Sequence, residues 1–498
     1  MGDCLSRGAV MEGVWKAGKL CAYVLAIVSG LSAFAVRIPA QAVANGGANS
    51  IQALFVSDIH FEPFRDPGKA AQLAAAPATE WDTILSSPAS ADAAAQWTKL
   101  DQACPTRGAD TSYVLYQSSL HAIHAQASGA KFVILSGDLI AHSFSCKFAA
   151  VFPKATPADY RAFVEKTIAY VLANLRVALP GVPVYAALGN NDSDCDDYQL
   201  DANSAFLKES GEVFAADLHG AEQTQALKDF AAGGYYSVSL PAPVENARLL
   251  VLDDLFMSER YQTCGGKADA APAAAQIVWL KQQLDEARDK KEKVWVMAHI
   301  PPGVDSYSTA RKWKELCGGG KPKMFLSSEA LPEVLADYGD VVQLAIFAHT
   351  HMDEVRLLMP AKAAEAQKPV AVKMVASISP IDGNNPSFTV ATVDPAHAIL
   401  EDYRVIAASN QSGIGASWSE EYDFAKTYHE SAFTAATVES LIAGFKADAA
   451  AQSSASQSYL RYYMTGVDMR MLALIWEPYV CSLTNAASDA YRECVCGK

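Results

Sequence analysis

Two histidines one residue apart, His349 and His351, stand directly after an apolar run. The run from Val341 to Phe347 is short and continuous, which predicts a buried β-strand. The pair therefore lies where a strand ends and a loop begins, and a bend there would turn both rings toward one point. Imidazole nitrogens are common ligands of zinc and other transition metals. Taken alone, the pair is better explained as polar residues at a strand end.

Four other apolar runs end in the same way, in aspartate, asparagine or histidine. The motifs after the five predicted strands are Asp58-Ile59-His60, Gly137-Asp138, Gly189-Asn190-Asn191, His299 and His349-Thr350-His351. In open α/β sheets, ligands bind outside the carboxyl ends of the strands. We therefore expect these residues to meet in space although they are scattered along the chain. The glycines before Asp138 and Asn190 allow the backbone to turn tightly there.

The side chains in these motifs suit a pair of metal ions. Imidazole and carboxylate together bind zinc, iron or manganese, and no thiolate is needed. Two metals about 3.5–4 Å apart require a carboxylate that bridges them, and such sites activate water for hydrolysis of phosphate esters. The sequence therefore predicts two divalent metal ions at the ends of these strands.

In this order, the motifs resemble those of the calcineurin-like metallophosphoesterases, whose series is D-x-H, G-D, G-N-H, H and G-H-x-H. Here the series is DIH, GD, GNN, H and AHTH, and it covers about residues 52–355. A finer resemblance is to the acid sphingomyelinase-like phosphodiesterases, which are secreted. GDLIAH (137–142) is similar to their G-D-x-x-A-H, and HIPPG (299–303) to their H-x-P-P-G. The resemblance implies a four-layer α/β/β/α sandwich that hydrolyses phosphodiesters with metal-activated water.

The resemblance also implies a division of the ligands. The first metal would be held by Asp58, His60 and His351, the second by Asn190, His299 and His349, and Asp138 would bridge the two. Zinc is implied by the secreted members, whereas the residues suit iron or manganese equally well.

Two positions depart from the family pattern. Ala348 replaces the glycine before H-x-H, a small change that the site should tolerate. Asn191 replaces the histidine of G-N-H, which in relatives stabilises the transition state or protonates the leaving oxygen. An amide donates a hydrogen bond but supplies no proton, so His142 becomes the expected general acid and Asn191 keeps only a stabilising role. The alternative for His142 is that it orients a metal ligand.

Alternating strand and helix patterns predict an α/β domain. We expect strands at 51–57, 131–137, 182–189, 235–240, 247–254, 293–299 and 341–349, and helices at 113–130, 158–179 and 274–290. Strand patterns at 370–377, 388–393 and 399–406 predict a second sheet, and from about residue 407 the pattern becomes helical. The acidic run NNDSDCDDY (190–198) is interpreted as a solvated loop with helix caps in preference to a Ca²⁺ site.

The N-terminus has the parts of a secretory signal peptide. Lys16 and Lys19 precede an apolar stretch (20–36), and an A-x-A sequence ends at Ala44. An uncleaved membrane anchor is the alternative, since the stretch is near the lower limit of a spanning length. We therefore divide the chain into a signal peptide (1–44), a catalytic domain (45–406) and a helical C-terminal region (407–498), and expect a secreted or periplasmic protein without stable membrane insertion after cleavage.

The cysteines agree with export. Of ten cysteines, eight follow Ala44, and an even number in an exported chain indicates disulfides. Proximity in the sequence suggests the pairs Cys104 with Cys146, Cys264 with Cys317, and Cys481 with one of the last two cysteines.

The 498 residues carry a net charge of −15 and no long basic block, so duplex nucleic acid is not an expected partner. We expect a monomer acting on a small phosphoester. The short segment between Ala44 and Asp58 leaves no room for the lipid-presenting domain of true acid sphingomyelinases, which favours a soluble substrate such as a nucleotide derivative over membrane lipid. A phosphomonoesterase or polyphosphatase on the same scaffold, and a metal-binding relative without activity, are the alternatives.

Overall fold

The computed structural model describes residues 50–498 except 311, 361–367, 468 and 498. The predicted signal peptide (1–44) lies outside the described residues. Within the described residues, no helix is both long and apolar enough to cross a membrane. The residues from 46 onward form one compact unit.

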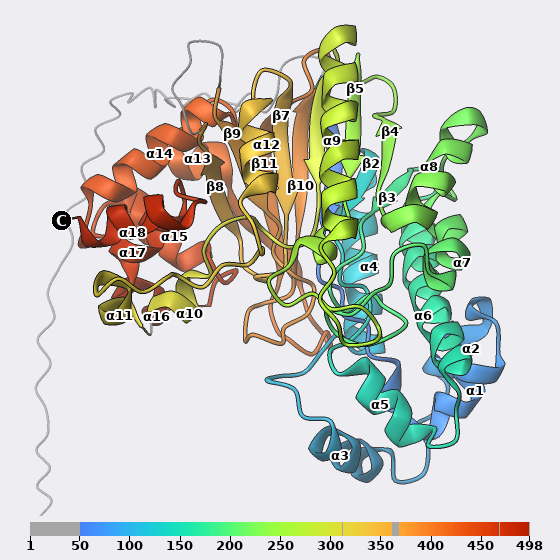
Figure 1. Ribbon diagram of the computed structural model, residues 1–498. Helices are drawn as coiled ribbons and strands as arrows, with labels where there is room; N and C mark the ends of the chain where they lie inside the picture. Colours follow the sequence, from blue (N-terminus) through green and yellow to red (C-terminus); the bar gives the residue numbers. More distant parts are fainter. Residues whose placement is uncertain (1–49, 311, 361–367, 468, 498) are drawn as a thin grey trace, which may run out of the picture. The chain divides into compact units, whose positions relative to one another are not determined.

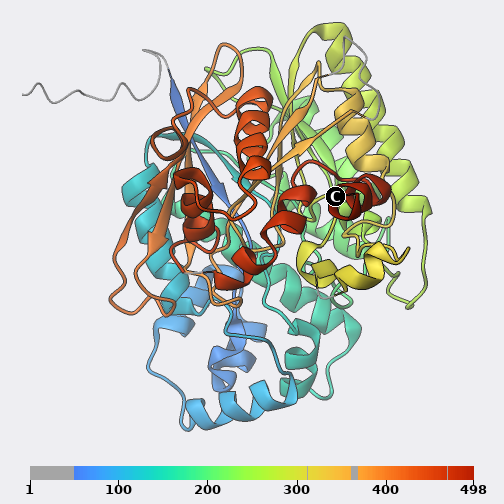
Figure 2. The ribbon, with the colours of Figure 1, turned by 90° about the vertical axis from the view of Figure 1, so that its left-hand side faces the viewer.

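Two six-stranded sheets form the centre of this unit (Figures 1 and 2). The first sheet has the order β12 (Trp418–Asp423), β11 (Ile399–Ala408), β10 (Ser387–Asp394), β1 (Ile51–Val56), β2 (Ala130–Leu135) and β3 (Val184–Ala186). The second has the order β4 (Tyr236–Ser239), β5 (Ala247–Val251), β6 (Lys293–Met297), β7 (Val342–Phe347), β9 (Val370–Met374) and β8 (Glu354–Leu358). The runs β1–β2–β3 and β5–β6–β7–β9 are parallel, and the outer strands are antiparallel. Parallel strands place their carboxyl ends at one edge of each sheet, which is where the site forms.

The sheets pack face to face through aromatic and branched side chains. Trp295 of β6 contacts Phe55 of β1 and Phe132 of β2, with ring centroids 6.1 and 5.8 Å apart, and its indole nitrogen donates to the carbonyl of Ala398 at 2.8 Å. All four side chains are fully buried. Such aromatic pairs contribute about 0.5–1.5 kcal/mol each beyond the area they bury.

Helices cover the outer face of each sheet, which gives the four-layer α/β/β/α sandwich that we predicted. The helices against the first sheet are α4 (Tyr113–Ala127) and α6 (Pro157–Ala178), and those against the second are α9 (Ala271–Lys290), α12 (Ala330–Asp337) and α14 (Ala435–Ala447). Helix α6 begins with a capping box between Thr156 and Asp159 and has Pro157 in its first turn. Its buried residues recur at helical spacing, so one stripe faces β3 and α4.

Further helices surround this sandwich. Short helices lie toward the lower end of Figures 1 and 2: α1 (Ala70–Ala75), α2 (Trp81–Ser86), α3 (Ala93–Ala103) and α5 (Phe144–Val151). Two more connect β3 to β4: α7 (Ala205–Phe214) and α8 (Gly220–Gly233). Helix α13 (Phe424–Tyr428) packs against β11 and β12 of the first sheet. The last group lies beside the second sheet: α10 (Ser306–Ala310), α11 (Trp313–Cys317), α15 (Ser454–Tyr462), α16 (Arg470–Leu474), α17 (Trp476–Ser482) and α18 (Ser488–Cys496).

The last residues of the chain cover the edge strand β8. The amide of Leu357 donates to the carbonyl of Leu483 at 2.8 Å, and the hydroxyl of Tyr479 donates to Glu354 at 3.1 Å. Covering an edge strand removes a row of unpaired backbone groups. The C-terminal helices are therefore part of the same compact unit as the sheets.

Three predictions about the fold differ from the structure. The strands between 370 and 408 do not form a separate sheet: β9 joins β7, whereas β10 and β11 extend the first sheet from β1. The region after 407 is not helical from its start, because β11 continues through Ala408 and β12 pairs with it before helix α13 begins at Phe424. The strand β8 and the helices α7 and α8 were not predicted.

The prediction of disulfides is confirmed, and their pairing was predicted in part. Cys104–Cys146 and Cys481–Cys494 form as expected, but Cys264 bonds to Cys195, and Cys317 bonds to Cys496. The proposed pair Cys264–Cys317 was wrong because the fold carries residue 317 to α18, where the chain ends.

Candidate metal centre and active site

The strand ends of both sheets meet at one place, as the sequence predicted. The amide of Asp58 donates to the carbonyl of Gly137 at 3.1 Å, which joins the ends of β1 and β2, and the amide of Ala348 donates to His299 at 2.9 Å, which joins the ends of β6 and β7. The loop after β9 connects the two sheets through its backbone. The amide of Ser379 donates to the carbonyl of Asp58 at 3.0 Å, and the amide of Ser377 donates to the carbonyl of His351 at 3.3 Å. Side chains from distant parts of the sequence therefore lie in contact.

The backbone at these strand ends is unusual. Five of the candidate ligand residues have positive φ angles between 44° and 69°: Asp58, His60, Asp138, His349 and His351. This conformation is uncommon for residues other than glycine and clusters at functional sites. At the nearby Gly189 there is no space for a side chain, because a Cβ there would lie 2.1 Å from Oδ1 of Asp138. The turns thus bring the side chains toward one centre at a cost in backbone strain.

A first group of donors consists of Asp58, His60, Asp138 and His351. Nε2 of His60 lies 3.4 Å from Oδ2 of Asp138 and 3.2 Å from Nε2 of His351, and that nitrogen of His351 lies 3.4 Å from Oδ1 of Asp58. All four side chains are buried. Nδ1 of His60 faces the carbonyl of Ile140 at 2.9 Å, which leaves Nε2 for the group.

A second group shares Asp138 with the first. Nε2 of His299 lies 3.1 Å from Oδ2 of Asp138 and 3.3 Å from Nδ1 of His349. Nδ1 of His299 faces the carbonyl of Ser136 at 2.7 Å, so its other nitrogen points into the group. Asn190 belongs to the same strand-end loop as Asn191, whose amide nitrogens bind Asp138.

The two groups fit metal ions. Donors bound tetrahedrally at about 2.0–2.1 Å from a cation lie roughly 3.3–3.4 Å from one another, which is the spacing of the atoms described above. Two further oxygens, Oδ1 of Asp58 and Oδ1 of Asn190, are buried without a hydrogen-bond partner in the described part of the chain. Buried polar atoms are normally paired, so these two are available to a cation. Asp138 stands between the groups, as a bridging carboxylate would.

Charge is distributed unevenly among the four histidines. Burial lowers the pKa of His60 and of His299, but the carboxylate of Asp138 outweighs this and raises the pKa of His60 to about 9 and of His299 to about 10. Burial and the neighbouring imidazolium instead hold the pKa of His349 and of His351 well below the usual range. In the metal-free protein, the protons on His60 and His299 therefore neutralise negative charge of the carboxylates, as bound cations would.

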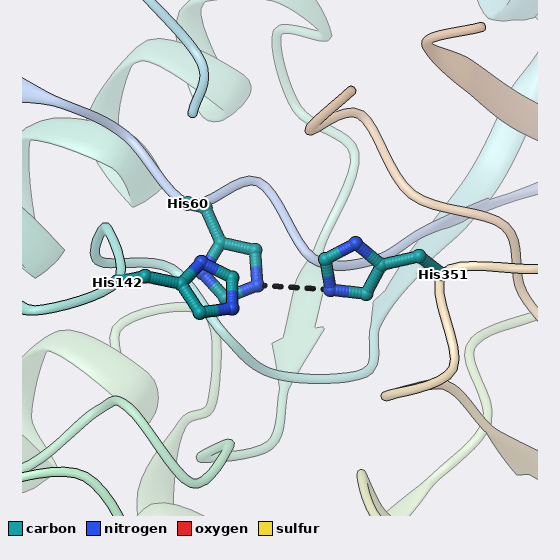
Figure 3. A group of neighbouring side chains, drawn as sticks. All are labelled: His60, His142 and His351. Atoms are coloured by element: carbon teal, nitrogen blue, oxygen red, sulfur yellow. Dashed lines mark hydrogen bonds between the residues drawn. The ribbon is translucent and has the colours of Figure 1, made fainter. Parts of the chain in front are cut away.

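His142 lies against the first group (Figure 3). Its ring stacks on that of His60 with centroids 4.0 Å apart, and it stands at the mouth of the site, about a quarter exposed. Asp110 holds it from behind: one carboxylate oxygen lies 3.0 Å from Nδ1, and the other accepts the backbone amide of His142 at 2.8 Å. Ser379 also donates to Asp110 at 3.0 Å. Because Nδ1 is engaged, Nε2 of His142 is the nitrogen left for a ligand or a proton transfer.

Asn191 stands beside the shared carboxylate. Its backbone amide donates to Oδ1 of Asp138 and its side-chain amide to Oδ2, both at 2.9 Å. Two more buried carboxylates support the loops. Asp192 accepts from the amides of Leu139 and Gly189 at 2.8 and 2.9 Å, and Asp254 accepts from the amide of Ile300 at 3.0 Å.

A cleft of about 930 Å³ opens over both groups. Arg107 and Arg260 lie on its rim, and Tyr463, Met464 and Met469 from the C-terminal region form part of its wall. A cleft of this size holds a small organic molecule. Its lining also contains aspartates, and Arg107 and Arg260 each pair with one of them, Asp382 and Asp197. The apolar and aromatic side chains of the wall suit a ligand that carries a ring or another apolar group.

The sequence reasoning missed several residues at this site. Asp110 lies outside the predicted strands and helices, and its partner His142 is 32 positions away, so no spacing signal marks it. Asp382, whose Oδ2 lies 3.3 Å from Nδ1 of His351, follows β9. It lies eight residues beyond the end of β9 at Met374, so the rule that drew attention to the other strand ends does not mark it.

Comparison with known proteins agrees with this geometry. Residues 51–353 match the model of the calcineurin-like phosphoesterase family, which is more than half of the chain, so the chain belongs to that family. It is a metal-dependent phosphoric ester hydrolase, the class of enzyme that we predicted.

Individual relatives share only 23–24% of their residues with this chain over the aligned length. The chain is 24% identical over 328 residues to a sphingomyelinase phosphodiesterase D from Dictyostelium discoideum, covering 64% of this chain and 66% of that protein. It is 24% identical over 430 residues to the acid sphingomyelinase-like phosphodiesterase 3b of Homo sapiens, covering 79% and 85%. A cyclic GMP-AMP phosphodiesterase of Homo sapiens is 23% identical over 397 residues, covering 78% and 80%.

Proposed function

We propose that the protein is a secreted phosphodiesterase with two divalent metal ions, and that it hydrolyses a small soluble phosphodiester such as a nucleotide derivative. The observation that carries this proposal is the pair of donor groups that share Asp138, with Oδ1 of Asp58 and Oδ1 of Asn190 buried and unpaired among the described residues. The names of the relatives support a diester, and one of them is named for a cyclic dinucleotide.

In this proposal Asp58, His60 and His351 hold the first metal, Asn190, His299 and His349 hold the second, and Asp138 binds both. When bound, two such cations supply a water that ionises near neutral pH and neutralise charge on the phosphoryl oxygens. Zinc is our choice of metal, and iron and manganese suit the same ligands.

His142 would act as the general acid. Asp110 engages Nδ1, so Nε2 can carry the proton that the leaving oxygen needs. Asn191 would hold the carboxylate of Asp138 in place through two hydrogen bonds. It cannot itself protonate a leaving group, because a carboxamide has no titratable proton at a useful pH.

The cleft and the cysteines support the rest of the proposal. A volume of about 930 Å³ is near the upper limit of ordinary small-molecule pockets, and Arg107 and Arg260 would attract an anion. The four disulfides are typical of proteins that mature in an oxidising compartment. We therefore keep secretion, with residues 1–44 as the signal peptide, as part of the proposal.

The alternative is a phosphomonoesterase or polyphosphatase, because the sequence Gly189-Asn190-Asn191-Asp192 resembles that of secreted or vacuolar polyphosphatases. A side-by-side assay of bis-p-nitrophenyl phosphate and p-nitrophenyl phosphate separates the two, with metal content measured on the same sample before and after treatment with EDTA. We expect turnover of the diester, lost with EDTA and in His351→Ala. Turnover of the monoester alone would favour the alternative.

A third result of that assay would be two bound metals without turnover of either compound. It would point to a metal-binding relative without activity, and Asn191→His would then be the decisive variant. If histidine at 191 restores turnover, the asparagine is the cause of the lost activity. A purified protein that binds no divalent metal would refute the proposal as a whole.

A further inference from the structure

We propose that Asp197 and Tyr198 are positioning residues for the second metal group, and that the disulfide Cys195–Cys264 keeps them in place. The inference rests on the proposed function, since it assumes that a divalent cation binds to Asn190, His299 and His349. It concerns the acidic run 190–198, which we interpreted from sequence as a solvated loop. In the structure, this run folds back onto the site, and Tyr198 is 5% exposed.

Asp197 determines which end of the Asn190 side chain faces the metal group. Nδ2 of Asn190 donates to Oδ1 of Asp197 at 2.7 Å. A carboxylate only accepts hydrogen bonds, so the amide cannot turn its oxygen toward Asp197. Oδ1 of Asn190 must then point the opposite way, and it is the buried oxygen that has no partner in the described chain. Only this oxygen, and not the amide nitrogen, can bind a cation.

Tyr198 similarly orients the ring of His349. Its hydroxyl lies 3.1 Å from Nε2 of His349, while Nδ1 of the same ring faces His299 in the second group. A neutral imidazole carries its proton on one nitrogen, and a metal takes the other. With Nδ1 bound to a cation, Nε2 carries the proton and donates it to the Tyr198 oxygen. A hydroxyl can donate as well as accept, so the cation on Nδ1 sets the tautomer, and the hydroxyl of Tyr198 fixes the rotation of the ring.

The two residues are clamped to the neighbouring segment 258–264. The guanidinium of Arg260 lies over the Tyr198 ring, 3.8 Å from its centroid, and donates to Oδ2 of Asp197 at 3.3 Å. The backbones pair as well, because the amide of Gln262 donates to the carbonyl of Tyr198 at 3.0 Å. The disulfide Cys195–Cys264 joins the same two segments, with Cα atoms 5.5 Å apart. The loop is therefore held by a cross-link, a cation and the backbone together.

We call Asp197, Tyr198, Arg260 and the disulfide Cys195–Cys264 the clamp. Its residues Asp197 and Tyr198 contact Asn190 and His349, which both belong to the second group. The ligands of the first group are oriented by other parts of the chain, such as Ile140 for His60 and Asp382 for His351. Loss of the clamp should therefore weaken one metal and leave the other bound. Partners of metal ligands typically contribute about 10- to 100-fold in metal affinity.

The test compares metal retention in Asp197→Asn and Tyr198→Phe with the unmodified protein. Each protein is loaded with Zn²⁺ and dialysed against a series of chelator concentrations, and the bound zinc is measured by mass spectrometry. We expect one of the two zinc ions to leave either variant at about 10- to 100-fold lower free chelator than it leaves the unmodified protein, while the other is lost at the same point in all three. Tyr198→Phe keeps the ring under Arg260 and removes only the hydroxyl, so it should fold normally.

Asp340→Asn is the control, because it also removes the charge of an aspartate that pairs with an arginine. Its carboxylate faces Arg288 of α9 at 2.6 Å and contacts neither the clamp nor the site. A second readout uses Mn²⁺, since two coupled ions and a single ion give different electron paramagnetic resonance spectra. At a Mn²⁺ concentration that just fills both sites of the unmodified protein, we expect the coupled spectrum in the control and the single-ion spectrum in both variants.

The outcomes separate this inference from the proposed function. Two metals in the unmodified protein with equal retention in both variants would overturn the inference and leave the proposed function intact. Equal weakening of both metals would also overturn it, since the clamp would then act on the whole site. No metal in any of the proteins would refute the proposed function itself.

Discussion

Metal binding should release protons from His60 and His299. Both rings lie against Asp138, and their pKa values are about 9 and about 10 in the metal-free protein. At pH 8 the two rings together then carry about 1.9 protons, whereas two histidines of ordinary pKa would carry about 0.1. A cation needs the deprotonated nitrogen, so binding of two metals should release close to two protons. His349 and His351 are already neutral and contribute none.

The proton count is measurable by isothermal titration calorimetry at pH 8. The protein is titrated with Mn²⁺ in two buffers that differ in ionisation enthalpy, and the difference in heat gives the number of protons released. Mn²⁺ is preferable here because the water it binds ionises less readily than water on Zn²⁺. His299→Asn should lower the count by about one. A release below about 0.5 protons would refute the electrostatic reasoning, because both rings would then be neutral before the metal binds.

His397→Ala provides the control for this experiment. That histidine is 68% exposed and lies 2.6 Å from Asp394, far from any donor group described above. Its removal should leave the proton count unchanged.

The same two pKa values determine how the stability of the metal-free protein depends on pH. A histidine whose pKa is higher in the folded than in the unfolded state stabilises the fold fully below its unfolded value of about 6.5. That contribution is lost as the pH rises through about 9 for His60 and about 10 for His299. The melting temperature of the EDTA-treated protein should therefore fall across this interval. Bound metal should remove most of the dependence, because metal affinity rises over the same pH range.

Two further predictions concern single side chains near Asp138 and His142. Replacing Asp110 by Asn should lower kcat by about 10- to 100-fold for diesters with poor leaving groups. It should affect p-nitrophenyl diesters much less, because p-nitrophenolate departs without a proton, and an equal loss on both substrates would argue against His142 as the acid. Gly189→Ala should remove bound metal, since the new Cβ would lie 2.1 Å from Oδ1 of Asp138. Gly444→Ala, where the Cβ meets nothing within 4 Å, should keep both metals.

The convergence of the candidate residues could be predicted because their positions in the sequence follow a simple rule. Asp58, Asp138, Asn190, His299 and His349 each follow an apolar run, and parallel strands place those ends at one edge. The rule needs no knowledge of which strand pairs with which. The pairing itself depends on contacts between distant residues, so the sequence pattern did not show that β9 and β10 belong to different sheets.

The strands that were missed lack the apolar signal. In β8, Glu354 and Arg356 are buried as an ion pair with side chains 3.2 Å apart, so a charged sequence forms an edge strand that is nevertheless buried. In β12, the sequence WSEEYD has half its residues acidic, because this strand lies at the edge of the first sheet and is partly exposed. Asp110 gave no signal for a related reason, since its role depends on a partner that only the folded chain brings near.

The position of β1 has a consequence for how the chain is made. This strand lies in the middle of the first sheet. Its partner β10 follows it in the chain by more than 330 residues, with Ile51 opposite Val393. While the chain is being synthesised, β1 can pair with β2 on one side only, and its other edge stays open until the residues of β10 have emerged. Sheets that depend on such distant pairing fold slowly and expose apolar edges in the meantime. The growing chain therefore needs protection from aggregation for most of its synthesis, and a product that stops before residue 387 would carry the ligands of both metal groups on a sheet that cannot be completed.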